Sequence, residues 1–186
     1  MALRPNLFHI LFALVAAMGT GLSTGCSDPP PSGPVRLGGS SVTALPATVV
    51  EAVDGDTVDV RFGDGHTDRV RLLGIDTPET VDPDRPVGCF GPEASGHTKS
   101  LLPAGTQVLL QRDVEARDRY GRLLVYMWRR RDSLFVNESL VRDGFARTLS
   151  IAPNTAHRVD LSEAAALARQ ERDGLWSACH ADGRDP

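Results

Sequence analysis

The stretch from residue 57 to residue 75, TVDVRFGDGHTDRVRLLGI, decides the fold. Its first six residues alternate apolar and polar side chains, and this period of two predicts a β-strand with one buried face. Glycines mark a turn at 63–65, and a second strand-like run follows at 69–75. The stretch therefore predicts two neighbouring strands of an antiparallel meander.

Three further segments are predicted as strands, at 47–53, 107–113 and 123–128. Helices are expected at 91–102, in the segment that ends at Gly144, and at 156–173, where Leu161, Ala164, Ala165 and Ala168 recur at helical spacing. Five strands with a helix between the third and the fourth is the order of an OB-type barrel. We therefore predict a β-barrel plus α fold, a five-stranded OB-fold barrel with three helices.

The N-terminus has the layout of an export signal. Arg4 precedes an apolar run at 7–18, and small residues lead from there to Cys26. The run is shorter than the about 20 residues that a membrane span needs, although a short hydrophobic helix would show a similar pattern. The residues before Cys26 resemble a bacterial lipobox, so we expect Cys26 to be lipidated and to anchor the protein to a membrane; simple secretion is the alternative.

These features divide the chain into four parts. Residues 1–26 are the expected signal peptide, and residues 27–46, rich in Pro, Gly and Ser, are the expected linker. Residues 47–180 are the expected folded domain, and residues 181–186 are a short tail.

Composition limits the kinds of binding that the chain can perform. The chain has 186 residues, with 20 basic and 24 acidic side chains and a net charge of −4. This charge argues against a polybasic nucleic-acid binder, so any phosphate site must be local. With aromatic residues at 5%, a long base-stacking surface is not expected either.

Two cysteines remain once Cys26 is assigned to the lipid. Cys89 and Cys179 form an even pair in a chain expected to be exported, and oxidising conditions favour a disulfide between them. Because spacing alone cannot prove proximity, two unrelated buried thiols are the alternative.

Charged residues gather in three short segments: VDGDT at 53–57, RLLGIDTPET at 71–80 and DRYGR at 118–122. In a regular strand Arg71 shares a face with Leu73 and Ile75, so we expect it to be partly buried and to need an anionic partner. Neighbouring carboxylates repel each other, and a divalent cation converts that repulsion into attraction.

Taken in order, these segments resemble the staphylococcal nuclease (thermonuclease) family. The resemblance runs from about residue 48 to residue 176 and continues through GPEAS at 91–95, VNE at 136–138, LVR at 140–142, PN at 153–154 and LWS at 175–177. It implies an OB-type barrel with three helices, in agreement with the pattern above. It also implies a Ca²⁺-dependent phosphodiesterase that acts on DNA and RNA and leaves the phosphate on the 3′ side of the product.

The resemblance further implies roles for individual residues. Asp56 and Asp76 match carboxylates that hold Ca²⁺, together with the backbone carbonyl of Thr77. Glu79 matches the general base for the attacking water and reaches the ion's shell through water.

Arg71 and Arg122 match the two guanidinium groups that grip the scissile phosphate, where negative charge grows during cleavage. Arg85, Arg119 and Tyr120 are the expected substrate-binding residues, although Tyr120 is also consistent with an aromatic at the rim of the core. Asp54 is interpreted as a turn residue rather than a ligand.

The sequence also departs from the family pattern. Where the founding member has tyrosines that cover the bound base, this chain has the run LSIA at 149–152. Base stacking of about 1–3 kcal/mol per base is therefore expected to be missing. The loop at 81–90 is less basic than in the founding member, and a disulfide at Cys89 would limit its motion.

The sequence thus predicts an exported monomer that binds Ca²⁺ and hydrolyses DNA and RNA with little sequence preference. One alternative is a non-catalytic OB-fold nucleic-acid-binding module, and another is an envelope structural protein with a vestigial site. The enzyme is favoured because five functional positions occur together: Asp56, Arg71, Asp76, Glu79 and Arg122.

Overall fold

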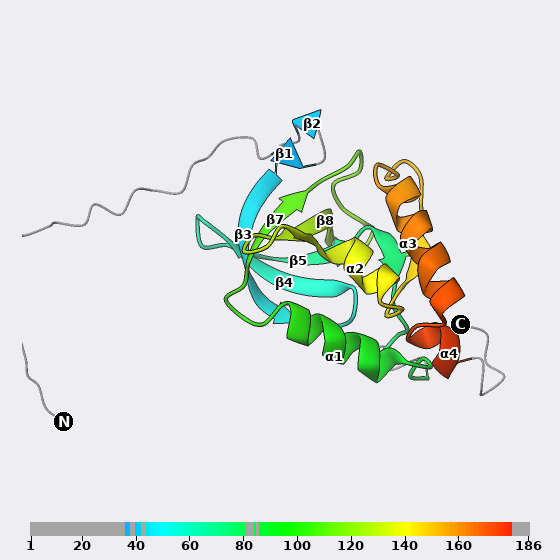
Figure 1. The fold of residues 1–186 in the computed structure, drawn as a ribbon. Helices are drawn as coiled ribbons and strands as arrows, with labels where there is room; N and C mark the ends of the chain where they lie inside the picture. The colour runs from blue at the N-terminus through cyan, green and yellow to red at the C-terminus, as the bar shows by residue number, and fades with distance from the viewer. Residues whose placement is uncertain (1–35, 38–39, 42–43, 81–83, 85, 180–186) are drawn as a thin grey trace, which may run out of the picture. The chain divides into compact units, whose positions relative to one another are not determined.

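A computed structural model describes residues 36–37, 40–41, 44–80, 84 and 86–179 (Figure 1). The expected signal peptide at 1–26, its lipidation residue Cys26, the substrate-binding candidate Arg85 and the tail at 181–186 lie outside the described residues. Within the described part, no helix is both long enough and apolar enough to cross a bilayer.

A five-stranded barrel forms the centre of the fold. Its strands are β3 (Ala44–Ala52), β4 (Thr57–Phe62), β5 (Thr67–Leu72), β7 (Gln107–Gln111) and β8 (Leu123–Arg129). They lie in the order β5-β4-β3-β7-β8 with antiparallel neighbours, and a parallel pairing of β5 with β8 closes the barrel. The prediction of a five-stranded OB-type barrel is confirmed.

In the described residues, one short strand and two short strand pairs lie outside the five barrel strands. β9 (Leu134–Phe135) continues the sheet beside β8, and β1 (Arg36–Leu37) pairs with β2 (Ser40–Ser41). β6 (Gly74–Asp76) forms a separate antiparallel ribbon with β10 (Arg147–Leu149). Strand β3 begins at Ala44 rather than at the expected residue 47.

The alternating apolar residues of the strands fill the barrel. Val58 and Val60 of β4 and Val70 of β5 have no exposed surface, as the period of two predicts for inward-facing positions. Burying side chains of this size stabilises the fold by about 1.5–3 kcal/mol each. The rigid barrel is the platform on which the connecting segments are held.

The described residues form four helices, where three were expected. They are α1 (Gly91–Leu101), α2 (Val136–Arg142), α3 (Arg158–Glu171) and the single turn α4 (Leu175–Ala178). Helix α3 buries the four residues that its spacing predicted, Leu161, Ala164, Ala165 and Ala168. The sequence did not predict α4, because one helical turn is too short to show a periodic pattern.

The predicted strand at 69–75 is interrupted, which corrects the sequence analysis. β5 ends at Leu72, and β6 starts at Gly74, whose φ is +75°. The positive φ requires glycine there, and a Cβ atom at Gly74 would lie 2.4 Å from Cδ1 of Leu161, which would have to shift. The alternation that placed Arg71, Leu73 and Ile75 on one face therefore does not hold.

A buried asparagine holds this interruption in place. Asn137 has no exposed surface; its side chain accepts a hydrogen bond from Met127 N (2.9 Å) and donates one to the carbonyl of Leu73 (2.8 Å). α2 packs between the barrel and α3, while α1 packs against β3 (Figure 1). The end of β5 and the β6–β10 ribbon are thereby fixed side by side.

Candidate functional site

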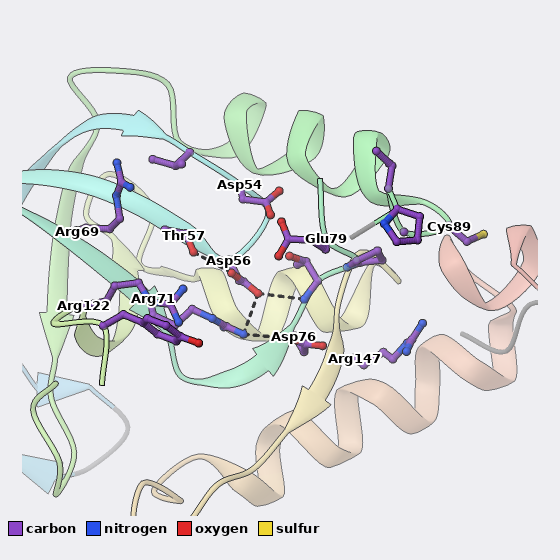
Figure 2. Close-up of a pocket in the computed structure, with 17 residues that line it drawn as sticks. Asp54, Asp56, Thr57, Arg69, Arg71, Asp76, Glu79, Cys89, Arg122 and Arg147 are labelled. Atoms are coloured by element: carbon purple, nitrogen blue, oxygen red, sulfur yellow. Dashed lines mark hydrogen bonds and ion pairs between the residues drawn. The ribbon is translucent and has the colours of Figure 1, made fainter. Parts of the chain in front are cut away.

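One pocket of about 990 Å³ gathers most of the predicted site residues (Figure 2). It is lined by the turn between β3 and β4, by the β6 segment and by residues 86–89. Of the predicted residues it contains Asp56, Arg71, Asp76, Thr77, Glu79, Tyr120, Arg122 and Cys89. Arg119 lines a neighbouring pocket of about 680 Å³, which Tyr120 and Arg122 also line.

The turn between β3 and β4 carries two of the acids. The N–H groups of Val53 and Asp54 both donate to the carbonyl of Thr57, at 2.9 and 3.1 Å. A Cβ atom at Gly55 would lie 2.6 Å from Oγ1 of Thr77, so the close approach of these two segments requires glycine there. This contact sets the acids of the turn against the segment that carries Asp76.

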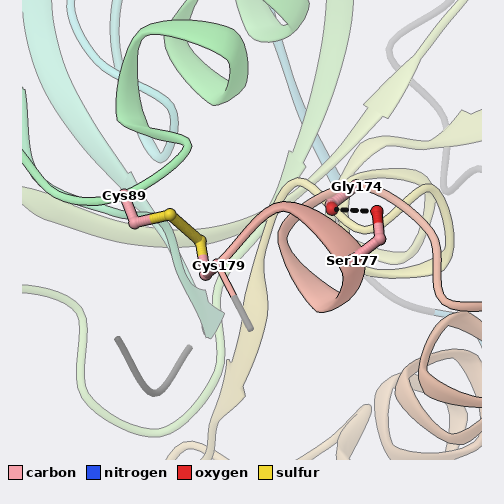
Figure 3. Close-up of a disulfide and its surroundings, with 4 residues drawn as sticks. All are labelled: Cys89, Gly174, Ser177 and Cys179. Carbon is pink, nitrogen blue, oxygen red and sulfur yellow. Dashed lines mark hydrogen bonds between the residues drawn. A yellow bond between two sulfur atoms is a disulfide. The ribbon is translucent and has the colours of Figure 1, made fainter. Parts of the chain in front are cut away.

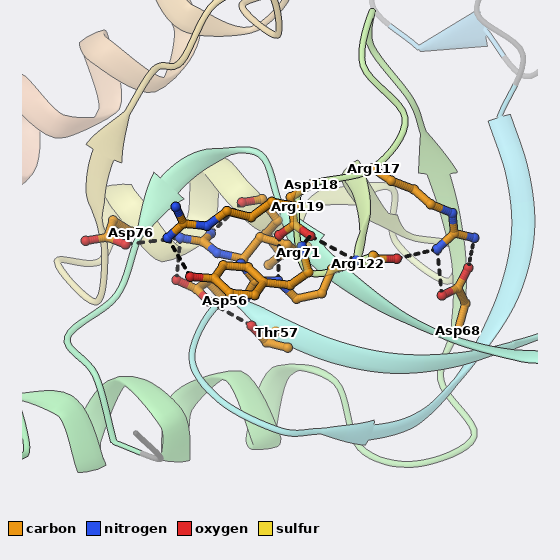
Figure 4. Close-up of polar contacts among 12 residues, drawn as sticks. Asp56, Thr57, Asp68, Arg71, Asp76, Arg117, Asp118, Arg119 and Arg122 are labelled. Carbon is orange, nitrogen blue, oxygen red and sulfur yellow. Dashed lines mark hydrogen bonds and ion pairs between the residues drawn. The ribbon is translucent and has the colours of Figure 1, made fainter. Parts of the chain in front are cut away.

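Arg71 lies between Asp56 and Asp76 (Figure 4). Its Nη2 is 2.9 Å from Oδ2 of Asp56 and 3.0 Å from Oδ1 of Asp76, and its side chain is only 14% exposed. Its Nη1 donates to the carbonyls of Leu72 and Ile75 at 2.8 and 2.9 Å. The expectation of a partly buried arginine with anionic partners is confirmed.

The backbone and a hydroxyl fix the carboxylate of Asp56. Thr77 N donates to its Oδ2 at 3.2 Å, and Thr57 Oγ1 donates to its Oδ1 at 3.0 Å. Asp56 and Thr77 are both buried, at 7% exposed each. The orientation of Asp56 is therefore set by the protein before any ligand binds.

Asp54 also lines the pocket, in addition to shaping the turn. It is 5% exposed and accepts a hydrogen bond of 2.6 Å from Oγ1 of Thr80. Burial raises the pKa of Asp54 above its ordinary value; the bonds from Thr80 and Gly55 lower it, and the charges of Asp56 and Glu79 add to the increase. No local pattern distinguishes an aspartate that only shapes a turn from one that also faces a pocket.

Asp118 holds Arg122 at the edge of the pocket (Figure 4). Its Oδ2 accepts a hydrogen bond from Arg122 Nε at 2.7 Å, and its Oδ1 accepts from the backbone N–H groups of Tyr120 and Arg122 at 2.9 Å each. The guanidinium of Arg122 lies 5.4 Å from the ring centroid of Tyr120, and Tyr120 is 68% exposed. The aromatic ring therefore stands at the pocket edge, open to solvent.

A hydrogen bond and a disulfide hold residues 88 and 89 beside the pocket. Gly88 N donates to the carbonyl of Glu79 at 2.8 Å, and the next residue, Cys89, forms a disulfide with Cys179 (Figure 3). The two Cα atoms lie 5.8 Å apart. The predicted disulfide is confirmed, and the alternative of two unrelated thiols is wrong.

The donor set around Asp56 suits a hard cation. Two carboxylates converge on one cationic nitrogen of Arg71, so positive charge is already favoured at this position. Oγ1 of Thr77 is buried without a hydrogen-bond partner in the described structure, and every candidate donor is an oxygen. No group of three or more His, Cys, Asp or Glu side chains in the described residues meets the geometry of a metal site, so carbonyl, hydroxyl or water oxygens would complete the shell.

Sequence reasoning missed two arginines of this pocket. Arg69 lines it and forms a paired contact with Asp59, at 2.7 and 2.9 Å. Arg147 lines it from β10, where it is the cross-strand partner of Asp76. Because this pairing joins segments far apart in the chain, no local motif could have predicted the position of Arg147.

Comparisons with known proteins agree with this geometry. The family model described as "Staphylococcal nuclease homologue" matches residues 69–178. The thermonuclease of Staphylococcus intermedius is 38% identical over 144 residues, which cover 77% of this chain and 83% of that protein. The thermonuclease of Staphylococcus hyicus is 37% identical over 147 residues, covering 78% and 85%.

Another relative is the endonuclease YncB of Bacillus subtilis (strain 168), which is 37% identical over 135 residues that cover 70% of this chain and 61% of that protein. The family model spans more than half of the chain, and both staphylococcal relatives align over most of their own length. The chain therefore belongs to the staphylococcal nuclease homologue family.

Proposed function

We propose that the protein is a Ca²⁺-dependent nuclease that hydrolyses the phosphodiester bonds of DNA and RNA with low sequence specificity outside the cytoplasm. The observation that carries the proposal is the gathering of Asp56, Arg71, Asp76, Glu79 and Arg122 around one pocket. Relatives named thermonuclease and endonuclease support the same activity.

In the proposed reaction, water attacks the phosphorus of the scissile diester. Glu79 accepts a proton from that water as the O–P bond forms. The bond to the 5′ oxygen of the leaving nucleotide breaks, this oxygen takes up a proton from solvent water to become a hydroxyl, and the phosphate stays on the 3′ side. Arg122 is held through Nε by Asp118, so its two Nη groups are directed away from that contact and are available to an anion.

Arg71 takes part in the proposed hydrolysis beside the two carboxylates that it contacts. In the described structure Arg71 neutralises Asp56 and Asp76. Asp56, Asp76 and the carbonyl of Thr77 are the residues that would hold Ca²⁺, with Glu79 at the edge of its shell. When bound, the ion supplies positive charge that stabilises the negative charge developing on the phosphate. Arg71, whose guanidinium lies beside Asp56 and Asp76, would donate to the phosphate oxygens.

Export is the second part of the proposal. The disulfide between Cys89 and Cys179 supports it, because such bonds persist in oxidising compartments. A lipid anchor at Cys26 and a monomeric state remain predictions. The mass of the N-terminal peptide of protein recovered from the producing cell distinguishes a lipidated Cys26 from simple secretion.

The test is hydrolysis of single-stranded and double-stranded DNA and RNA by the full-length protein, with Ca²⁺ and with a chelator. We expect cleavage only with Ca²⁺, and we expect Glu79→Gln to lower turnover by about 10²–10⁴-fold, because the amide cannot accept the proton. Glu163→Gln, on the exposed face of α3, is the matched control and should keep full turnover.

Cleavage that survives the chelator would refute the metal dependence, and full turnover in Glu79→Gln would refute its role as the base. If the folded protein binds nucleic acid in Ca²⁺ but cleaves none, the non-catalytic OB-fold binding module replaces the nuclease.

A further inference from the structure

Arg147 occupies a position in the pocket that the proposed mechanism does not use. It is paired across the β6–β10 ribbon with Asp76, so both side chains arise from the same face of the ribbon. In the view of Figure 2, Asp76 lies between Arg71 and Arg147. The pocket thus extends beyond the acids, from Arg69 and Arg122 at one end to Arg147 and Cys89 at the other.

The arginines of this pocket differ in their counter-ions. Arg69 is bound by Asp59, Arg122 by Asp118, and Arg71 by Asp56 and Asp76, all within 3.0 Å. Within the part of the chain that the structure describes, Arg147 has no carboxylate partner. Its neighbour Asp76 uses its carboxylate for Arg71 instead.

The guanidinium of Arg147 is also incompletely bonded. Its Nε is buried, and no described residue accepts a hydrogen bond from it. Burying a charged donor without an acceptor costs free energy, which an anionic ligand would offset. A guanidinium offers a planar pair of donors that matches the geometry of a carboxylate or a phosphate group, and in a polynucleotide substrate the anionic group available to it is a phosphate.

The wall next to Arg147 is fixed in position. Residues 86–89 line this end of the pocket, and the disulfide of Cys89 with Cys179 ties them to the C-terminal helix. A volume of about 990 Å³ far exceeds that of one phosphate group. A polynucleotide offers a further phosphate beside the scissile one, carried on the same chain.

We propose that Arg147 binds a second phosphate of the substrate, next to the scissile phosphate and on the side away from Tyr120. This inference rests on the proposed nuclease function and specifies its substrate: a chain with at least two phosphodiesters is preferred over a dinucleotide. Arg147 is a substrate-binding residue here and takes no part in bond breaking.

The test compares kcat/KM on a thymidine dinucleotide, which has a single phosphodiester, with kcat/KM on a thymidine oligomer of about eight nucleotides. The substrate ratio is kcat/KM on the oligomer divided by kcat/KM on the dinucleotide. In Arg147→Gln we expect this substrate ratio to fall about 10-fold, because one charge-assisted contact to the oligomer is lost. The loss should come from a higher KM for the oligomer rather than from a lower kcat. Arg130→Gln is the matched control. It removes the same charge from an exposed site outside the pocket and should leave the ratio at the wild-type value.

A binding measurement gives a readout that does not depend on turnover. Binding of the same oligomer is measured at several salt concentrations with Glu79→Gln and with Glu79→Gln combined with Arg147→Gln. Loss of one phosphate contact on a single strand should reduce the slope of log affinity against log salt by about 0.7. Arg147→Lys keeps the positive charge but lacks the planar guanidinium. It should therefore show the wild-type dependence of affinity on salt, but only part of the wild-type preference for the oligomer in kcat/KM.

The outcomes separate the two proposals. The first outcome is that the wild type cleaves both substrates, and that Arg147→Gln and Arg130→Gln have the same kcat/KM ratio and the same salt dependence of binding. This outcome refutes the second phosphate site and leaves the nuclease function intact. If the wild type cleaves neither substrate, the nuclease fails, and an unchanged salt slope then also refutes the site. If circular dichroism shows that Arg147→Gln does not fold, Arg147→Lys is the deciding variant. A wild-type ratio of kcat/KM between oligomer and dinucleotide in Arg147→Lys would contradict recognition by the planar guanidinium.

Discussion

Asp118 accepts three hydrogen bonds, and through them it sets the direction of Arg122. Burial on its own would raise the pKa of Asp118, but the side-chain and backbone bonds from Arg122 and the backbone bond from Tyr120 outweigh burial and hold the pKa below its ordinary 3.8. The carboxylate is thus ionised wherever the protein is folded near neutral pH. It is a positioning residue, since it acts on the phosphate only through Arg122.

Asp118→Asn should therefore affect both stability and turnover. Because the folded pKa lies below the unfolded value, ionised Asp118 stabilises the fold above pH 3.8, and this contribution is lost as the pH falls through the folded pKa. We expect the variant to lose about 1 kcal/mol of unfolding free energy at neutral pH and to converge with the wild type in acid. Urea unfolding at a series of pH values measures both effects.

Turnover of Asp118→Asn should fall about 10-fold at neutral pH, because Arg122 loses the charged partner that orients it. Glu163→Gln serves again as the exposed control. An equal stability difference at every pH would contradict the role of the Asp118 charge.

Among the elements, the turn between β3 and β4 is held by a close contact with the segment after β6. Gly55 packs against Thr77, so that the turn with Asp54 and Asp56 meets the residues that follow β6. Here the sequence predicted the flanking strands correctly, because alternation over 57–62 is a local property. It also predicted that the acids meet, through the family resemblance, but it could not supply the contact that requires glycine.

Gly55→Ala tests this contact. The added methyl group would lie 2.6 Å from Oγ1 of Thr77, so the turn must shift. We expect a loss of about 1–3 kcal/mol in unfolding free energy and reduced turnover as Asp56 moves. Gly63→Ala is the matched control, because no atom lies within 4 Å of the added Cβ and its φ is not positive. Equal stability of the two variants would refute the close approach.

The break after β5 shows why part of the site escaped prediction. Alternation extended the strand from 69 to 75, whereas tertiary packing by Leu161 and Asn137 ends it at Leu72 and starts β6 at Gly74. β6 then pairs with β10, and this long-range pairing brings Arg147 to Asp76. Local periodicity contains no information about such a pairing, so the strand type was predictable and its partner was not.

In the molecule as a whole, one covalent link joins the pocket to the C-terminal helix. Cys89 borders the pocket, and Cys179 has no exposed surface at the end of α4. The pair was predictable because two of the three cysteines remain once Cys26 is assigned to the lipid, in a chain expected to be exported. Its place beside the pocket was not, because it depends on how α4 packs after α3.

Removing this link should destabilise the folded state more than any surface change. A disulfide that spans 90 residues is expected to contribute about 4 kcal/mol in the chain-entropy model. The double variant Cys89→Ser with Cys179→Ser should lose about that much in urea unfolding. Reduced wild-type protein is the control and should unfold at the same urea concentration as the variant; a variant as stable as the oxidised wild type would contradict the prediction.

The same link has a consequence for protein that a protease has cut. Any single backbone cleavage between Cys89 and Cys179, for example in the arginine-containing segment between β7 and β8, leaves two fragments that remain one covalent molecule. Arg122 and Arg147 lie on the enclosed part, while Asp56, Asp76 and Glu79 precede it. The acids and the arginines of the pocket would therefore stay together after such a cut, and the cut molecule would separate into fragments only when it is both reduced and unfolded.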